Sequence, residues 1–136
     1  MRVLYLLPPN YRAINAAFDV RGRPVIFTYG DTIFNPAKIK VTPALQAHEA
    51  VHSHRQGDNP GEWWERYIED PEFRLNEEIP AHQAEYREFC RHHADTKRML
   101  HEIARRLSSS LYGKLIDFDE AVSVIECREN YEAHAI

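Results

Sequence analysis

The first part of the chain carries short apolar runs separated by turn signals, which is the pattern of a small β-sheet. Val3–Leu7 is predicted to form a strand that ends at two prolines, because proline cannot donate a hydrogen bond to a neighbouring strand. Residues 24–29 and 32–34 are rich in β-branched and aromatic side chains, which favour strands. Gly30 and Asp31 between these two runs suit a tight turn, so we expect either a hairpin or one bulged edge strand over residues 23–35.

Cap and stop signals predict helices from residue 42 onward. Thr42 suits the N-cap, Pro43 suits the first helical turn, and Gly57 suits the end of a helix. A helix is therefore predicted from Pro43 to Gln56. Residues 62–69 are predicted to form a second, shorter helix that ends near the Asp-Pro pair that follows them.

The second half of the chain has apolar residues at helical spacing. From about Glu77 to Leu107 this spacing predicts one long helix, and residues 95–96 are the place where it would break if it is interrupted. Asp117 and Glu120 are spaced as in a capping box and lead into residues 121–125, which are predicted to belong to a last helix of about four turns. The helical pattern of this half and the strand pattern of the start differ clearly.

Together these elements predict an α+β fold in which a small, mostly antiparallel amino-terminal sheet packs on a helical bundle. The chain has 136 residues, which is the size of one ordinary domain. It shows no internal repeat, low-complexity segment or linker that would divide it. Residues 1–136 are therefore predicted to form a single domain.

Composition argues against two classes of partner. The chain has 17 basic and 21 acidic residues, so it offers no surplus of positive charge to attract a phosphate backbone. No apolar segment approaches the roughly 20 residues that a transmembrane helix needs. The apolar run before Pro8 is also too short for a signal peptide. We expect a soluble, cytoplasmic protein with no nucleic-acid partner and no membrane partner.

The sequence His48-Glu49-Ala50-Val51-His52 is an HExxH motif in the middle of the first long predicted helix. Residues four apart lie on one face of a helix, so the two neutral imidazoles can bind one zinc ion at about 2.0 to 2.1 Å. Glu49 then lies beside the open side of the metal. It can act as the general base that activates a zinc-bound water.

A catalytic zinc needs a third protein ligand, and three residues are candidates. Glu78 lies 26 residues after His52, which leaves room for a loop, a helix and a return. Asp58 lies where the metzincin pattern places its last ligand, but that pattern needs a glycine where Arg55 stands. Glu77 is a rival to its neighbour because sequence locates the start of a helix only to within a residue or two. We favour Glu78.

His48 and His52 followed by Glu78 and Ala81 resemble the gluzincins, zinc peptidases whose third ligand is a glutamate on a second helix. The resemblance implies a minimal zincin-like fold, a bound zinc ion and peptide hydrolysis. It also implies that Ala81 is small so that the two helices can approach closely. His82 stands where gluzincins often have an aspartate that accepts a hydrogen bond from a ligand imidazole.

A looser likeness over residues 24–90 is to compact HExxH domains of bacteria and phages. In gluzincins, extended substrate adds to the strand before the active helix, which implies that a peptide or protein substrate binds along an edge strand near Thr32–Phe34. The reaction also needs a group that stabilises the oxyanion. Arg74, His82 and Tyr86 are the nearest candidates by position.

The leading interpretation is therefore a zinc-dependent hydrolase, a metallopeptidase with Glu49 as its base. The alternative is a catalytically inactive zinc-binding protein that serves as an assembly or host-interaction module. Hydrolytic activity of the zinc-loaded protein distinguishes the two, because both need the metal and only the first turns over a substrate.

Overall fold

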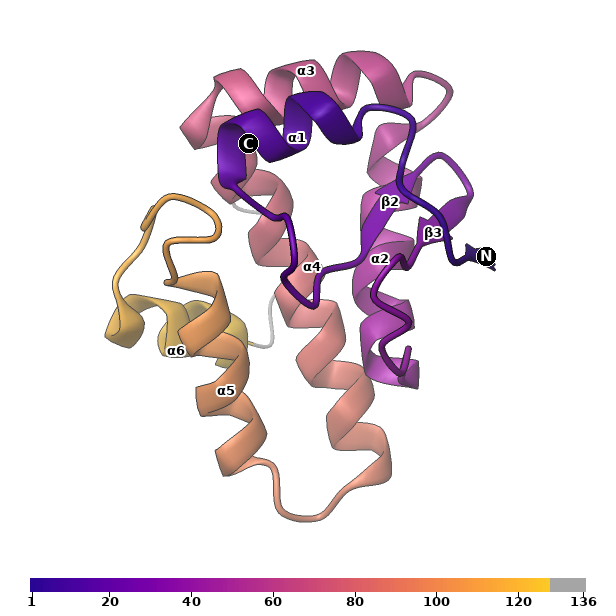
Figure 1. Cartoon of the computed structure of the whole chain (residues 1–136). Coiled ribbons are helices and arrows are strands. Elements are labelled where there is room, and N and C mark those ends of the chain that lie inside the picture. The colour runs from indigo at the N-terminus through magenta and orange to yellow at the C-terminus, as the bar shows by residue number, and fades with distance from the viewer. Residues whose placement is uncertain (128–136) are drawn as a thin grey trace.

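The computed structural model describes residues 1–127, which form an α+β fold as predicted. Three short strands lie near the amino terminus, and six helices make up most of the rest of this range (Figure 1). The elements in chain order are β1 (Arg2–Leu4), α1 (Tyr11–Phe18), β2 (Phe27–Tyr29), β3 (Thr32–Phe34), α2 (Pro43–Gln56), α3 (Pro60–Glu69), α4 (Pro71–His92), α5 (Lys97–Leu107) and α6 (Phe118–Glu126).

The sheet has the order β1-β3-β2. β2 and β3 form an antiparallel hairpin, the first of the two alternatives predicted for this segment, and Gly30 between them has a φ of +64°, a conformation that glycine adopts without strain. β1 pairs with β3 in parallel, because α1 carries the chain across before the hairpin begins. The prediction that Thr32–Phe34 is an edge strand is therefore wrong: β3 is the central strand, and β2 is the edge that packs on α2.

The first strand and the segment after it differ from the prediction. β1 is shorter than Val3–Leu7, because it ends at Leu4 and the side chains of residues 5–7 are exposed. The helix α1 was not predicted at all. Its N-cap residue makes no side-chain capping bond, and one buried side chain, Ile14, anchors it to the core, so its local signals are weak.

Helix α2 has the predicted bounds. The Thr42 hydroxyl accepts a hydrogen bond from the backbone N–H of Leu45 at 3.2 Å, and Pro43 occupies the first turn. Gly57 ends the helix with a φ of +58°. These interactions are local in sequence, which explains why cap signals alone predict the bounds.

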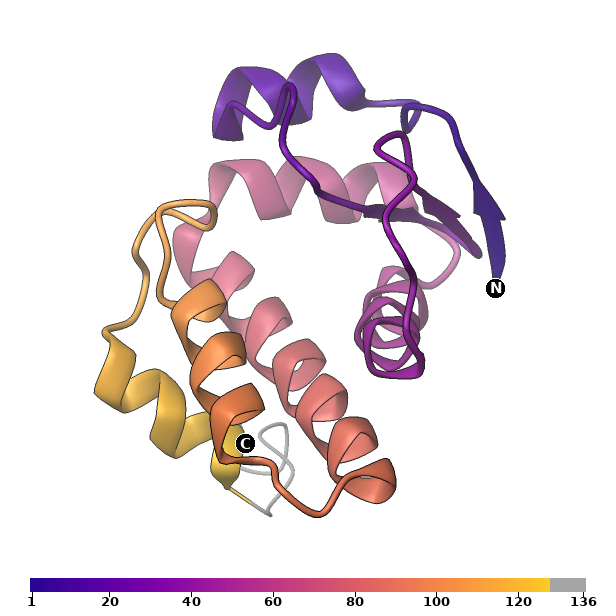
Figure 2. The ribbon, with the colours of Figure 1, turned by 60° about the horizontal axis from the view of Figure 1, so that its bottom comes forward.

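Helix α4 begins at Pro71, six residues before the predicted start at Glu77. The Asp70 carboxylate caps it by accepting hydrogen bonds from the backbone N–H groups of residues 72 and 73. Pro80 lies inside the helix, where proline is unfavourable, so the sequence pattern does not reveal that the helix begins earlier. The long helix predicted up to Leu107 is two helices: residues 93–96, next to the possible break at 95–96, separate α4 from α5, and α5 returns alongside α4 (Figure 2).

Two apolar clusters form the core of the described part of the chain. The first joins α1, β2 and α3, and the second joins α4, α5 and α6. Helix α2 packs along α4, so the face of α2 that carries the HExxH motif lies between the two clusters. Within residues 1–127, no helix combines the length and the apolar character needed to cross a bilayer.

Candidate metal centre

Helix α2 and helix α4 bring three ligand-type side chains together. His48 and His52 come from α2, one turn apart, and Glu78 comes from the middle of α4. Oε1 of Glu78 lies 3.4 Å from Nε2 of His48 and 3.2 Å from Nε2 of His52. All three side chains are buried, and their ligand atoms lie within 4.8 Å of one another.

These distances suit a metal ion. Two ligands of a tetrahedral ion, each bonded at about 2.0 to 2.1 Å, are separated by about 3.3 to 3.4 Å. The distances of 3.4 and 3.2 Å from Glu78 to the two imidazoles agree with that separation. In addition, Oε1 of Glu78 is buried and has no hydrogen-bond partner, which is costly unless a cation binds it. The group of His48, His52 and Glu78 can therefore hold a metal ion.

Tyr67 orients the carboxylate of Glu78. Its hydroxyl donates a hydrogen bond to Oε2, so Oε1 is left to face the two histidines. Burial raises the pKa of Glu78, but His52 and His48 outweigh it and hold this pKa well below its usual range. Burial, and then the negative charge of Glu78, raise the pKa of Tyr67, so its hydroxyl keeps its proton and remains a donor.

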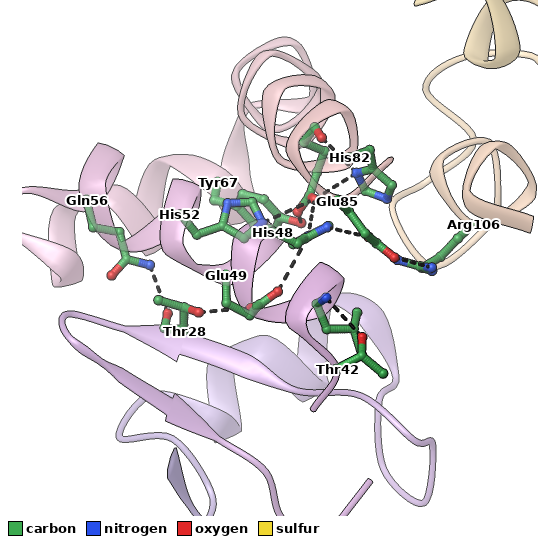
Figure 3. A network of polar contacts seen from close by, with 12 residues as sticks. Thr28, Thr42, His48, Glu49, His52, Gln56, Tyr67, His82, Glu85 and Arg106 are labelled. Atoms are coloured by element: carbon green, nitrogen blue, oxygen red, sulfur yellow. Dashed lines mark hydrogen bonds and ion pairs between the residues drawn. The ribbon is translucent and has the colours of Figure 1, made fainter. Parts of the chain in front are cut away.

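Glu85 and Arg106 fix the orientation of the His48 ring on the side of its Nδ1 atom (Figure 3). Nδ1 of His48 donates to Oε1 of Glu85 at 2.9 Å, which fixes the tautomer and turns Nε2 toward Glu78. Two nitrogens of Arg106 in α5 bind the two Glu85 oxygens at 2.7 and 2.9 Å. Glu85 was not among the residues predicted from the sequence, although its spacing of seven residues from Glu78 puts both on one face of a helix.

Charge at this centre is unbalanced without a cation. Burial lowers the pKa of His48, but the carboxylates of Glu49, Glu78 and Glu85 outweigh burial and raise the pKa to about 10. Burial likewise raises the pKa of Glu85, and His48 and Arg106 more than reverse this, so its pKa lies below the usual range. A proton or a metal ion is therefore needed to balance the buried carboxylates.

His82 does not orient a ligand imidazole. Its Nδ1 lies 2.7 Å from the backbone oxygen of Glu78, in its own helix, and its ring meets that of His48 edge to face at 4.6 Å. Burial, and then the charge of His48, lower the pKa of His82 to about 3, so its ring is neutral. The hydrogen bond to a histidine that the resemblance implied for the residue at position 82 is made instead by Glu85, to Nδ1 of His48.

Glu49 lies beside the three ligand-type residues and is held from the sheet. Its Oε1 accepts a hydrogen bond from the hydroxyl of Thr28 in β2 at 2.9 Å, and its Oε2 lies 3.5 Å from Nε2 of His48. Gln56 and Trp64 each donate to the backbone oxygen of Thr28, at 2.8 and 3.0 Å. These bonds tie β2 to the helices and cover part of its outer edge.

Glu77 and Asp58, the two other candidates for the third ligand, lie outside the group of His48, His52 and Glu78. Both oxygens of Glu77 are occupied: Oε1 accepts from Nε1 of Trp63 at 2.6 Å, and Oε2 accepts from Nε of Arg55 at 2.8 Å. Asp58 is exposed in the turn after α2. Among the three candidates, Glu78 is therefore the carboxylate that meets the two histidines.

The three candidates for an oxyanion donor are all engaged elsewhere. Arg74 donates to backbone oxygens, including that of Tyr112 at 2.9 Å, and His82 bonds within α4. The Tyr86 hydroxyl donates to Thr96 at 3.2 Å, away from the group. Tyr112 itself, on the loop between α5 and α6, lines the cavity beside the histidines, and its hydroxyl makes no hydrogen bond to a described residue.

A cavity of about 270 Å³ opens beside Glu49, His48 and His52. Side chains from α1, the segment before β2, α3 and the loop between α5 and α6 form most of its wall, and most of them are apolar. A small molecule or a single side chain can therefore reach the candidate metal centre from within an apolar pocket.

No protein-family model, no curated protein and no solved structure matches this chain. The likeness to gluzincins therefore rests on the motif and on the residues around it. What these residues can do chemically follows from their own geometry.

Proposed function

We propose that the protein is a zinc-dependent hydrolase, a metallopeptidase whose zinc is held by His48, His52 and Glu78. The observation that carries the proposal is the convergence of two Nε2 atoms and the unpartnered Oε1 of Glu78 beside a cavity. Two imidazoles and one carboxylate form a ligand set of catalytic zinc, which keeps its fourth position open for water or substrate.

Glu49 is the general base in this proposal. When bound, zinc polarises the scissile carbonyl and lowers the pKa of a bound water toward ~7. Glu49 would accept the proton of the attacking water as the oxygen of that water forms a bond to the carbonyl carbon, and would then deliver this proton to the nitrogen that leaves when the C–N bond breaks. The bond from Thr28 to Oε1 leaves Oε2 of Glu49 on the side of His48 for this transfer.

Tyr112 is the donor that stabilises the oxyanion in this proposal. Its side chain lines the same cavity as Glu49, and its hydroxyl has no hydrogen bond to a described residue. Burial, and then the charge of Glu78, raise its pKa well above the usual value, so the phenol keeps its proton and can donate. A donor aimed at developing negative charge is one of the largest contributions to catalysis.

The decisive experiment combines metal analysis with an assay of hydrolysis. Protein purified without chelator is expected to contain about one zinc per chain and to hydrolyse an unfolded protein substrate. The Glu49→Gln variant is expected to keep the zinc and lose the hydrolysis. Zinc at far less than one equivalent after supplementation would reject the proposal.

One observation favours a second candidate function, a zinc-binding module without catalysis. The three ligand-type residues join α2 to α4 and are each 3 to 5% exposed, so a bound ion would also hold two helices together. Structural zinc sites, however, have four protein ligands, and the group found in residues 1–127 has three. One bound zinc with no hydrolysis of a broad peptide library would favour this second function.

A further inference from the structure

The part of the cavity away from the ligand-type residues is apolar. It is lined by Phe18 in α1, Val20 just after α1, Val25 before β2 and Leu111 after α5. Three of these side chains, Phe18, Val25 and Leu111, pack against the first apolar cluster, which fixes the shape of this wall. The aromatic residues Trp63 and Tyr67 continue it to His52, whose ring lies 5.4 Å from that of Trp63.

The volume suits one large side chain. An apolar cavity of about 150 Å³ is enough to bind benzene. The cavity here measures about 270 Å³, so it can take a phenyl or isobutyl group and still leave room for the acyl group beside Glu49. A methyl side chain would leave much of the wall without contacts, and lost contacts of this kind weaken binding.

The charges near the cavity disfavour a charged side chain. Among the described residues that line it, Arg106 is the only lysine or arginine, and two of its nitrogens already bind Glu85. The acidic residues Glu49 and Glu78 lie at the end with the histidines. An acidic or basic side chain in the apolar part would lose its hydration without gaining a partner.

We propose that the substrate carries a large apolar side chain, of the phenylalanine or leucine type, on a residue next to the scissile bond. This inference rests on the proposed function, because it places the scissile carbonyl at the histidines and Glu49. The adjoining side chain then enters the apolar part of the cavity, whose lining includes Val25 and Leu111.

Binding of small probes tests the inference without requiring turnover. N-acetyl hydroxamates of phenylalanine, leucine, alanine, aspartate and lysine are titrated into zinc-loaded protein by calorimetry. The phenylalanine and leucine probes are expected to bind at least about ten-fold more tightly than the alanine probe, because they bury more apolar surface. Equal affinities, or tighter binding of the aspartate or lysine probe, overturn the inference.

A second series separates this inference from the proposed function. The N-acetyl amides of the same amino acids lack the chelating group, and the same order is expected from ligand-observed NMR whether or not zinc is bound. If the apolar amides bind best while zinc content or hydrolysis is absent, the apolar pocket stands and the proposed function fails. If peptides are hydrolysed but neither series prefers apolar side chains, the proposed function stands and the inference is overturned.

Two cavity variants and one control test whether the apolar part of the cavity causes the preference for large apolar side chains. Leu111→Phe narrows the cavity and is expected to lower the ratio of phenylalanine to alanine probe affinity several-fold. Val25→Phe narrows it from a different segment of the chain and gives the same test if Leu111→Phe does not fold. Leu6→Phe is the matched control, because Leu6 is 60% exposed and does not line the cavity. An unchanged ratio in a folded Leu111→Phe or Val25→Phe variant overturns the inference.

Discussion

Oε1 of Glu85 lies 2.9 Å from Nδ1 of His48, and this contact orients the ring of His48 toward Glu78. The pair lies at the junction of α2, α4 and α5, because Arg106 of α5 binds the same carboxylate. Glu85 is 3% exposed, so its hydrogen bonds are not weakened by competition with water. The geometry of the candidate metal centre thus depends on a helix that contributes no ligand.

Glu85→Ala is expected to lower zinc affinity by about 10- to 100-fold, because His48 loses the acceptor that fixes its tautomer. A competitive titration against a zinc chelator measures this. The control is Glu88→Ala in the same helix, whose carboxylate contacts His92 and Arg91 at the surface. Equal losses in the two variants would show that Glu85 acts only through general stability.

Glu78→Ala is expected to lower zinc affinity far more than Asp58→Ala, because Oε1 of Glu78 is the carboxylate oxygen that faces both histidines. Asp58 is exposed, so its replacement should change the free energy of unfolding by about 0.5 kcal/mol or less. The same chelator competition measures both variants. A larger loss of affinity in Asp58→Ala would move the third ligand to the turn after α2.

Glu49→Gln is expected to retain zinc and to lower kcat by about 10²- to 10⁴-fold, since an amide cannot accept the proton from water. Turnover of an unfolded protein substrate, normalised to zinc content, measures this. Glu65→Gln is the matched control, because Glu65 is exposed on α3. Undiminished turnover of the Glu49 variant would remove Glu49 from the reaction.

Tyr112→Phe and Tyr67→Phe are expected to affect different quantities, kcat in the first case and zinc affinity in the second. Tyr112→Phe should keep zinc affinity and lower kcat by about 10²- to 10³-fold, as loss of an oxyanion donor does. Tyr67→Phe should weaken zinc binding, because Tyr67 orients the carboxylate of Glu78. Zinc affinity and kcat are measured for both. The reverse pattern would contradict both roles.

Removal of zinc is expected to lower the midpoint of thermal unfolding, because a bound ion joins α2 to α4. At a free zinc concentration of 100 times Kd the ion adds about 2.7 kcal/mol to the free energy of unfolding. Thermal unfolding with zinc and with chelator measures the shift. The His48→Ala variant is the control, and it should unfold at the same temperature in both conditions.

The sequence by itself determined the helix α2 and the pairing of His48 with His52 on one face. Thr42 and Gly57 lie at the two ends of that helix, and the spacing of four residues follows the helical repeat, so both features depend on neighbours in the chain. The hairpin of β2 and β3 was also predictable, because Gly30 marks its turn.

The tertiary structure decided which carboxylate meets the histidines. Glu77 and Glu78 are adjacent, and adjacent residues point about 100° apart around a helix, so one can face α2 while the other faces elsewhere. Which of them does so depends on how α4, beginning at Pro71, packs against α2. That packing turns Glu77 toward Trp63 and leaves Glu78 to the histidines.

Long-range packing also decided the partners around the site and the order of the sheet. Thr28 reaches Glu49, and Arg106 reaches Glu85, across separations of 21 residues each. β3 became the central strand because β1 pairs with it in parallel, which is possible since the unpredicted helix α1 carries the chain from β1 to the hairpin. Such contacts form when distant segments bury apolar surface together, and no local signal in the chain encodes their geometry.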